Sequence, residues 1–358
     1  MNKQLADLIH DYQVKVHEAL VLMQRSGIRM PSSNQRWIET DIPRKGLLDG
    51  DIAYVKHGAG CTVYLPDGEV DFDFGNLGEI NGFDLWRLSL FCSDKLSTYG
   101  FEDQDALERC FETAVSEGHL IRSDDFLFYI ANFTRALAVD IDSRLPGDNL
   151  PPRNRDIVMV LHSHYFQAAE LMLENYDNLS RKWKKSNSLS HRNVVDLRIY
   201  MSSWLGFLAV TCEGFENLGM HLLLQESRPA AFEELIPKSD SVGKMIKRHR
   251  NPLRELRNKT FHLREDPEAI RSFFARDANR LPWARELHDA FTDFFSVYRV
   301  QCEVHYAFNG RRGEMRVTRE PPRRHTMNVS YPLSQTAETR EDSAAHRVNG
   351  KIAVKTID

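Results

Sequence analysis

An arginine and a histidine stand five positions apart in a segment with helical character, and this pair is the chain's clearest indication of chemistry. The segment reads Arg257-Asn258-Lys259-Thr260-Phe261-His262. A guanidinium is a permanent cation that binds phosphate through two parallel hydrogen bonds, and an imidazole takes up or releases a proton near neutral pH. Together the two groups suit cleavage of an RNA phosphodiester without a metal ion.

Attack by the 2′-hydroxyl of RNA on its own phosphate needs a base, an acid and a cation against the charge that grows on phosphorus. We expect Arg257 to hold the non-bridging oxygens and His262 to serve as base or acid. Asn258 would orient a phosphate oxygen or the histidine. Steps of 100° per residue leave Arg257 and His262 about 140° apart around a regular helix. The helix must therefore fray near His262, or a second element must complete the site.

Charge is distributed unevenly, although the formal net charge is only -4. Residues 67–125 hold fifteen acidic residues against four basic ones, whereas residues 244–264 hold eight basic residues and one acid. The basic stretch surrounds the Arg257 and His262 pair and favours a polyanionic ligand. The candidate RNA-binding cations are Lys247, Arg250, Arg254 and Lys259. Glu213 or Glu216, on the preceding long helix, would orient His262.

Two other interpretations of these residue types stay open. Phe261 is expected in a core, so His262 beside it could be a buried histidine bonded to a carbonyl, with Arg257 in an ordinary ion pair. A cysteine nucleophile around a glycine-rich corner is a second candidate site, built from His57, Cys61, Asp71 and Asp73. Glycines at a hairpin corner need no such purpose, however, and a cysteine in a strand is most often a small buried hydrophobe.

The composition is that of an ordinary globular protein, and 358 residues suffice for about two domains. The five cysteines are odd in number and widely spaced, which argues against a disulfide framework and a zinc site. The N-terminus lacks the apolar run of a signal peptide, and no uninterrupted apolar stretch of about 18 residues could cross a bilayer. We therefore expect a cytoplasmic protein outside the membrane. Without a phosphate-binding glycine loop or a His-Glu-x-x-His motif, we expect no metal ion and no cofactor.

The first part of the chain predicts an α+β module over residues 1–142. Apolar residues at helical spacing predict a helix over residues 3–25, closed by Gly27. Three strands follow over residues 52–55, 62–65 and 70–74, the last two joined by a Pro66-Asp67-Gly68 turn. Short helices over residues 83–91 and 103–117 and a hairpin over residues 120–130 complete the module. A linker rich in proline, glycine and asparagine covers residues 143–154.

The second part predicts an all-α helical bundle over residues 155–309, so the chain is mainly α overall. Helices are expected over residues 156–184, with Val160 in the core stripe, and over residues 194–225, with Leu222 inward. The helix with the Arg257 motif should begin by Pro252 and end near residue 263. Asp266 would open a short helix and Pro282 the last long one. Residues 310–358 are expected to form a basic, flexible tail.

The arginine, polar residue, spacer and histidine pattern, placed in the penultimate long helix, resembles the HEPN superfamily (higher eukaryotes and prokaryotes nucleotide-binding). That resemblance implies a metal-independent endoribonuclease that leaves a 2′,3′-cyclic phosphate and a 5′-hydroxyl. It also implies a homodimer in which motifs from both copies line one cleft that binds RNA.

Residues from about 5 to 132 resemble an uncharacterised bacterial domain family seen in immunity-like and toxin-associated proteins. The resemblance rests on His57-Gly58-x-Gly60-Cys61, Val70-Asp71-Phe72-Asp73-Phe74-Gly75 and Gly82-Phe83-Asp84-x-Trp86-Arg87-Leu88. It implies a role in antiviral defence or toxin-antitoxin biology, with a toxin, an antitoxin or a phage component as partner of this module. The alternative function is therefore a non-catalytic immunity or interaction protein, whose bundle dimerises or binds nucleic acid.

Overall fold

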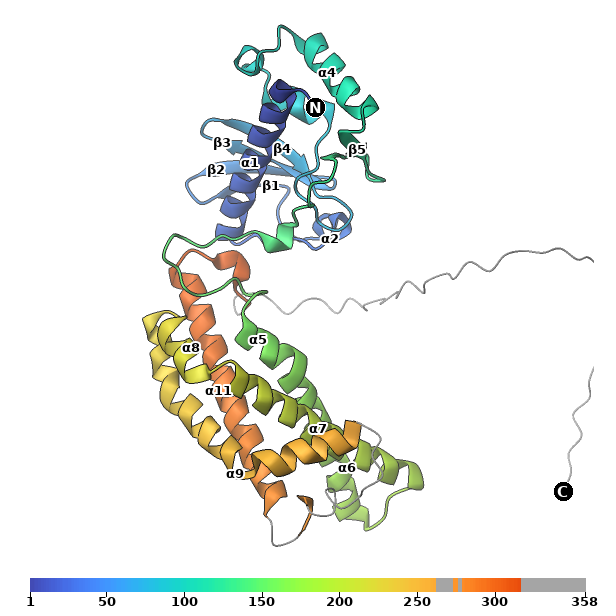
Figure 1. The fold of residues 1–358 in the computed structure, drawn as a ribbon, viewed down its shortest axis with the longest axis vertical. Coiled ribbons are helices and arrows are strands. Elements are labelled where there is room, and N and C mark those ends of the chain that lie inside the picture. The colour runs from blue at the N-terminus through green and yellow to red at the C-terminus, as the bar shows by residue number, and fades with distance from the viewer. Residues whose placement is uncertain (262–272, 276–278, 317–358) are drawn as a thin grey trace, which may run out of the picture. The chain divides into compact units, whose positions relative to one another are not determined.

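A computed structural model describes residues 1–261, 273–275 and 279–316. The described residues form a helix with a small antiparallel sheet, followed by a helical bundle (Figure 1). Each part has its own cluster of buried apolar residues. The predicted fold class, an α+β module before an all-α bundle, is confirmed.

The N-terminal module is built on helix α1 (Lys3–Arg25), which has the predicted bounds. Its buried side chains recur every three or four residues from Leu5 to Met23, so one stripe of the helix faces the core. Asn2 caps its start by accepting a hydrogen bond from the backbone of Gln4. The chain leaves the helix through Gly27, whose φ of +99° is accessible to glycine at little cost.

The sheet against α1 has four antiparallel strands in chain order: β1 (Lys45–Leu48), β2 (Ile52–His57), β3 (Gly60–Leu65) and β4 (Gly68–Asp73). The sequence did not predict β1, because this short edge strand is mostly exposed and contains a glycine. In the register of β3 and β4, Thr62 lies opposite Asp71 and Gly60 lies opposite Asp73. This alignment places polar side chains from neighbouring strands at one place on the sheet.

Short elements surround this sheet: α2 (Asn34–Ile38), α3 (Leu85–Phe91), the 3-10 turns η1 (Leu96–Tyr99) and η2 (Ala138–Asp140), α4 (Gln104–Ser116), and the hairpin of β5 (Leu120–Arg122) and β6 (Phe128–Ile130). Helices α3 and α4 begin where the sequence places N-caps. Asp84 accepts a hydrogen bond from the backbone of Arg87, and Asp103 accepts one from the backbone of Ala106.

The bundle contains α5 (Ile157–Leu161), the π-helical turn η3 (His162–Phe166), α6 (Gln167–Ser186), α7 (His191–Asn217), α8 (Met220–Glu226), the 3-10 turn η4 (Ala230–Leu235), α9 (Ile236–Phe261) and α11 (Arg280–Phe308). Two predicted helices are interrupted. The helix expected over residues 194–225 breaks at Gly219, whose φ is +56°, and the helix expected over residues 156–184 contains the π turn. Each interruption changes the spacing at which residues of the helix face the core. Val160 and Leu222, which were predicted to face inward, are consequently exposed.

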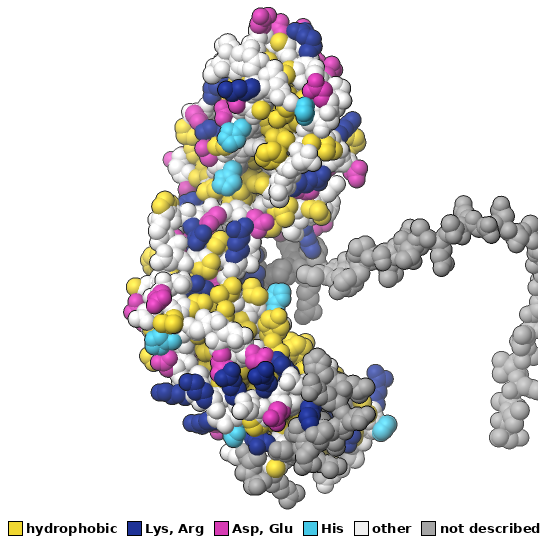
Figure 2. Space-filling view, in the orientation of Figure 1, with side chains coloured by type: hydrophobic (Ala, Val, Ile, Leu, Met, Phe, Trp, Pro, Cys, Tyr) yellow, Lys and Arg dark blue, Asp and Glu magenta, His cyan; other side chains and the backbone are white. Residues whose placement is uncertain are grey.

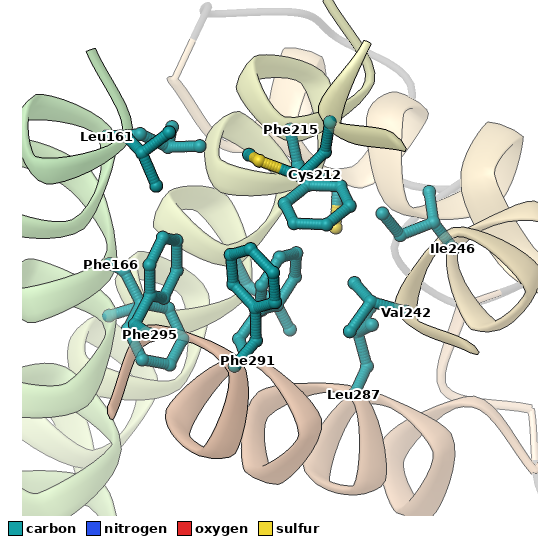
Figure 3. Packing of buried hydrophobic residues seen from close by; sticks show 14 of the residues in the cluster. Leu161, Phe166, Cys212, Phe215, Val242, Ile246, Leu287, Phe291 and Phe295 are labelled. Atoms are coloured by element: carbon teal, nitrogen blue, oxygen red, sulfur yellow. The ribbon is translucent and has the colours of Figure 1, made fainter. Parts of the chain in front are cut away.

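Aromatic side chains from several helices fill the centre of the bundle. Phe166, Phe291 and Phe295 lie together, and Phe215 packs edge-on against Phe291 (Figure 3). Val242 and Ile246 of α9 face the same core, which fixes the side of α9 that remains available to solvent. The apolar stripe therefore decides where the basic side chains of α9 are presented.

Helix α7 is the one helix among the described residues whose length and composition would allow it to cross a membrane. Its second half carries Trp204, Leu208 and Phe215 into the bundle core. A helix at the centre of a protein core has the same length and apolar composition as a membrane span. The described residues thus place the second half of α7 in the bundle core.

The segments just before and just after the bundle are bonded to each other, although a linker and a flexible tail were predicted there. Arg311, placed in the tail by the sequence, is 0% exposed and lies just before the 3-10 turn η6 (Arg312–Glu314). Its guanidinium donates to both carboxylate oxygens of Glu314, to Asp148 and to the carbonyls of Leu150 and Pro151. The segment predicted as a linker is thus held to the end of the bundle through Arg311. The tail from residue 317 onward lies outside the described residues.

Candidate active site

The helix that carries the Arg257 motif is longer than predicted and is kinked. Helix α9 starts at Ile236, and His249 interrupts it with φ -135° and ψ 28°. Pro252 explains the kink, because it has no N–H to donate to the carbonyl of Arg248 and its ring crowds that turn. The predicted start near Pro252 is therefore the start of the second half of α9. The kink turns this half so that its arginines face α7.

Arg257 is held in place by two side chains. Its Nη1 donates to Oε2 of Glu213 on α7, in a close ion pair. Its Nε and Nη2 donate to Oδ1 of Asn258, at 3.2 and 2.7 Å. The Arg257 side chain nevertheless remains 22% exposed. Arg257 is thus a fixed, partly exposed cation.

Two further arginines of α9 pair with glutamates of α7, one of them Glu213 again. Arg250 Nε lies 3.1 Å from Oε2 of Glu216, and Arg254 Nε lies 3.8 Å from Oε1 of Glu213. Both guanidiniums are more than half exposed, as is typical of cations that add little stability but can meet an anion in solvent. Figure 2 shows Lys and Arg side chains gathered beside acidic ones on this part of the bundle. Of the other predicted RNA-binding cations, Lys247 is exposed and Lys259 is partly buried.

A cavity of about 190 Å³ opens between α7 and α9, beside Arg257. Ala209, Cys212, Ile246, Leu253 and Trp283 form its apolar side, and Glu213, Glu216, Asn217, Arg250 and Arg254 form its polar side. Oε1 of Glu213 is buried and accepts no hydrogen bond from any described residue. A buried acceptor without a donor is uncommon, so this cavity is the clearest candidate ligand site in the bundle.

The structure brings together some of the predicted site residues and does not describe others. His262, the predicted proton carrier, lies outside the described residues. Glu213 and Glu216, predicted to orient His262, pair with Arg257 and Arg250. Any contact of theirs with His262 lies outside the described residues, so this role stays a prediction. Phe261 was predicted to lie in a core, and this prediction is wrong. It lies at the last turn of α9 and is 49% exposed. Its ring lies against Phe207 and the bare backbone of Gly206.

A second polar cluster lies in the N-terminal module, and we call it the His57 cluster: His57, Thr62, Asp71, Asp73, Asp84 and Arg87. Asp71 is its centre, since it accepts hydrogen bonds from His57 Nε2 at 2.8 Å, Thr62 Oγ1 at 2.6 Å and Arg87 Nε at 3.0 Å. Arg87 also pairs with Asp73 at 2.8 Å and with Asp84. Gly60 leaves room for this arrangement, because a Cβ there would lie 2.2 Å from the Asp73 carboxylate.

Cys61 does not belong to this cluster, and the suggested cysteine nucleophile is therefore wrong. The Cys61 side chain is fully buried in the apolar core of the module. Burial raises the pKa of its thiol to about 12, so the reactive thiolate is not formed near neutral pH. His57, Asp71 and Asp73 do come together, but without the thiol of Cys61.

Residues 5–130 match the family model described as a domain of unknown function (DUF6896). No curated protein and no solved structure matches the chain. The matched range agrees with the predicted resemblance of the N-terminal region to an uncharacterised family. It ends before α5, so the HEPN resemblance of the bundle stays a prediction.

The three motifs that suggested a family for the DUF6896 region meet in the His57 cluster. His57 comes from the first motif, Asp71 and Asp73 from the second, and Asp84 and Arg87 from the third. The role of Arg87 was not predicted from the sequence. The helix-capping pattern of Asp84 with Arg87 three residues later was the signal that could have located it. The cluster joins β2, β3, β4 and α3, so its first role is to hold the DUF6896 fold together.

We expect the stability of the DUF6896 region to depend on the charge of His57. The hydrogen bond to Asp71 raises the pKa of His57 above its usual value of 6.5. The pair therefore contributes its full stabilisation below about pH 6.5, and this contribution is lost as the pH rises through the folded-state pKa. Calorimetric melting of the full chain between pH 6 and 9 should show the loss, and His57→Asn should remove it. Parallel pH profiles for the two proteins would contradict this assignment.

Proposed function

We propose that the helical bundle is a metal-independent endoribonuclease of the HEPN type. The 2′-oxygen of RNA attacks the adjacent phosphorus and the bond from phosphorus to the 5′-oxygen breaks, which leaves a 2′,3′-cyclic phosphate and a 5′-hydroxyl. One proton leaves the 2′-hydroxyl and one reaches the 5′-oxygen, so no external reagent is consumed. Arg257 would stabilise the charge on the phosphorane, and His262 would carry one of the protons.

The observation that supports this proposal best is the fixed guanidinium of Arg257 on a helix with exposed cations. Glu213 and Asn258 hold the Arg257 fork, and a donor fixed before the substrate arrives stabilises developing charge without a cost of reorganisation. Arg254 and Arg250, about one and two helical turns away, would attract the RNA backbone. Glu213 and Asn258 accept from three of the five N–H groups of Arg257. We expect phosphate oxygens to accept from the other two, while Glu213 stays in place.

The resemblance to HEPN domains extends the proposal to the assembly and its setting. Two copies of the chain would pair so that a second histidine supplies the remaining proton transfer. The enzyme would act on RNA in the cytoplasm, in antiviral defence or as part of a toxin-antitoxin pair. The DUF6896 region would bind the toxin, antitoxin or phage component that controls the bundle.

The direct test is degradation of RNA by the purified full-length chain in the presence of a metal chelator. We expect cleavage that leaves cyclic phosphate ends, and we expect His262→Ala to abolish it while circular dichroism shows an unchanged helix content. Expression in cells should be toxic for the wild type, at once or after a trigger, and harmless for the variant. Equal RNA degradation by both proteins would attribute the activity to another site or to a contaminant.

A second candidate function is an interaction protein without catalysis, in which the bundle only dimerises or binds nucleic acid. The observation in its favour is that the donors of Arg257 already have partners inside the protein, as in an ordinary ion pair. This alternative predicts that RNA remains intact in the assay above. It also predicts that the His262→Ala protein still binds and inhibits the partner of the DUF6896 region.

A further inference from the structure

The cavity between α7 and α9, which we call the α7–α9 pocket, has a lining that suits a flat polar ring. Its volume of about 190 Å³ is below the roughly 300–1,000 Å³ of pockets for drug-sized ligands. Trp283 is fixed in its wall, since the indole Nε1 donates to the carbonyl of Met245 at 2.9 Å and the ring packs edge-on against His249. The dimensions favour a single heterocyclic base over a whole nucleotide.

The polar side of the pocket offers acceptors and donors in pairs. The carboxylates of Glu213 and Glu216, three positions apart on α7, are acceptors, and the guanidiniums of Arg250 and Arg254 are donors. Oε1 of Glu213 accepts no hydrogen bond from the described residues, since Arg254 Nε stays 3.8 Å away, and Glu216 uses Oε2 for Arg250. A ligand that completes this lining must therefore present hydrogen-bond donors to carboxylates. Arg254 and Arg250 are exposed enough to move aside or to stack on the ring.

Among the RNA bases, guanine fits these requirements best. Its N1–H and N2 amino group are neighbouring donors that one carboxylate can accept together, and its O6 and N7 are the acceptors that arginine prefers. Adenine, cytosine and uracil each combine a donor with an acceptor on the same edge, so one of their groups would face a carboxylate unfavourably. The glutamate and arginine side chains of the lining together therefore favour guanine over the other three nucleobases.

The pocket also lies at a suitable distance from Arg257. With a rise of 1.5 Å per residue, Arg254 is about 4.5 Å and Arg250 about 10.5 Å from Arg257 along the helix. The pocket, which both arginines line, is therefore within the length of one nucleotide from the phosphate position at Arg257. One nucleotide can therefore place its base in the pocket and its phosphate at Arg257.

We infer that the α7–α9 pocket binds the guanine base of the RNA nucleotide whose phosphate Arg257 holds, an inference that rests on the proposed ribonuclease function. Arg250 turns away from Oε2 of Glu216, so that this carboxylate accepts from the N1–H and N2 amino groups, and Arg250 or Arg254 donates to the opposite edge of the base. Glu213 keeps Arg257 in position beside the pocket. The enzyme therefore cleaves next to guanosine in single-stranded RNA, where the base can enter the pocket.

The first measurement is equilibrium binding of the four nucleoside 5′-monophosphates to the full-length chain by calorimetry. Guanosine monophosphate should bind at least ten times more tightly than the other three, and inosine monophosphate, which lacks the N2 amino group, should bind more weakly than guanosine monophosphate. Glu216→Gln should remove the preference for guanosine monophosphate. Glu226→Gln, which removes an exposed carboxylate on α8 outside the pocket, is the matched control and should retain it. Arg250→Ala is a second variant, because its exposed side chain is not needed for packing.

The second measurement is mapping of cleavage sites in RNA strands that contain a single guanosine, with inosine at the same position as the comparison. Cuts confined to the guanosine and weakened by inosine support the pocket. Binding selective for guanosine monophosphate without any RNA cleavage retains the pocket and removes the proposed nuclease. Cleavage without base preference, together with equal binding of the four monophosphates, overturns the pocket and leaves the nuclease standing.

Discussion

Replacing Arg257 by alanine is expected to reduce the rate of RNA cleavage by about 100-fold or more, as removal of one preorganised donor to a developing oxyanion does in other enzymes. The guanidinium is fixed in the last turns of α9 through Glu213 and Asn258. Alanine removes both the charge and the fork that would hold the phosphate oxygens. Single-turnover cleavage of a labelled RNA strand measures this effect on the chemical step.

Two further variants separate the role of Arg257 from general electrostatics. Arg257→Lys keeps the charge but loses the planar fork, so we expect it to recover only part of the rate. Arg198→Ala is the matched control, because Arg198 is exposed on α7 and lies about 22 Å along that helix from Glu213. It removes the same charge from the same bundle and should cleave at the wild-type rate. An equal decrease in the Arg257→Ala and Arg198→Ala proteins would mean that only bulk charge matters.

Replacing Arg311 by methionine is expected to lower the free energy of unfolding by about 3–5 kcal/mol, the usual cost of removing one partner from a buried ion pair. The Arg311 side chain is fully buried and donates to Glu314, Asp148 and two backbone carbonyls. Without it, Asp148 keeps the imidazole of His305 at 2.9 Å, and the Glu314 carboxylate stays in a mostly buried position. Urea unfolding of the full chain measures the loss.

The adjacent residue supplies the control for this prediction. Arg312 is 58% exposed and pairs with Asp49 at 3.2 Å on the surface. Because surface ion pairs contribute about 0–1 kcal/mol, Arg312→Met should be nearly as stable as the wild type. A similar stability of the two methionine variants would show that Arg311 behaves as a surface charge, contrary to its burial.

The sequence by itself was sufficient for elements whose signals are local. The spacing of apolar residues predicted a helix from about residue 3 to 25, the bounds that α1 has, and Gly27 marked its end. These signals need only the helical period and a position where the backbone takes a positive φ. The helices expected over residues 83–91 and 103–117 correspond to α3 and α4, which the structure shows capped by Asp84 and Asp103. The helical setting of Arg257 was predicted in the same way.

Breaks within helices were harder to predict, since each depends on a balance between local preference and packing. Pro252 suggested the start of a helix, yet α9 begins at Ile236 because Val242 and Ile246 are buried in the bundle core. Burial of that stripe stabilises a helical turn on each side of the proline and confines its effect to the kink at His249. The break at Gly219 is similar, because glycine inside a helical pattern gives no sign of whether it will adopt positive φ.

Amino-acid types and spacing alone determined the fold class, the two regions and the placement of Arg257 on a basic helix. The tertiary structure decided the partners of these charges. Glu213 meets Arg257 across 44 positions of sequence, His57 reaches Asp71 from another strand, and Arg311 is buried where a basic tail was expected. The physical reason is that a charged side chain has no preferred partner in the chain itself, so its partner is chosen when the apolar stripes pack and bring distant helices and strands together.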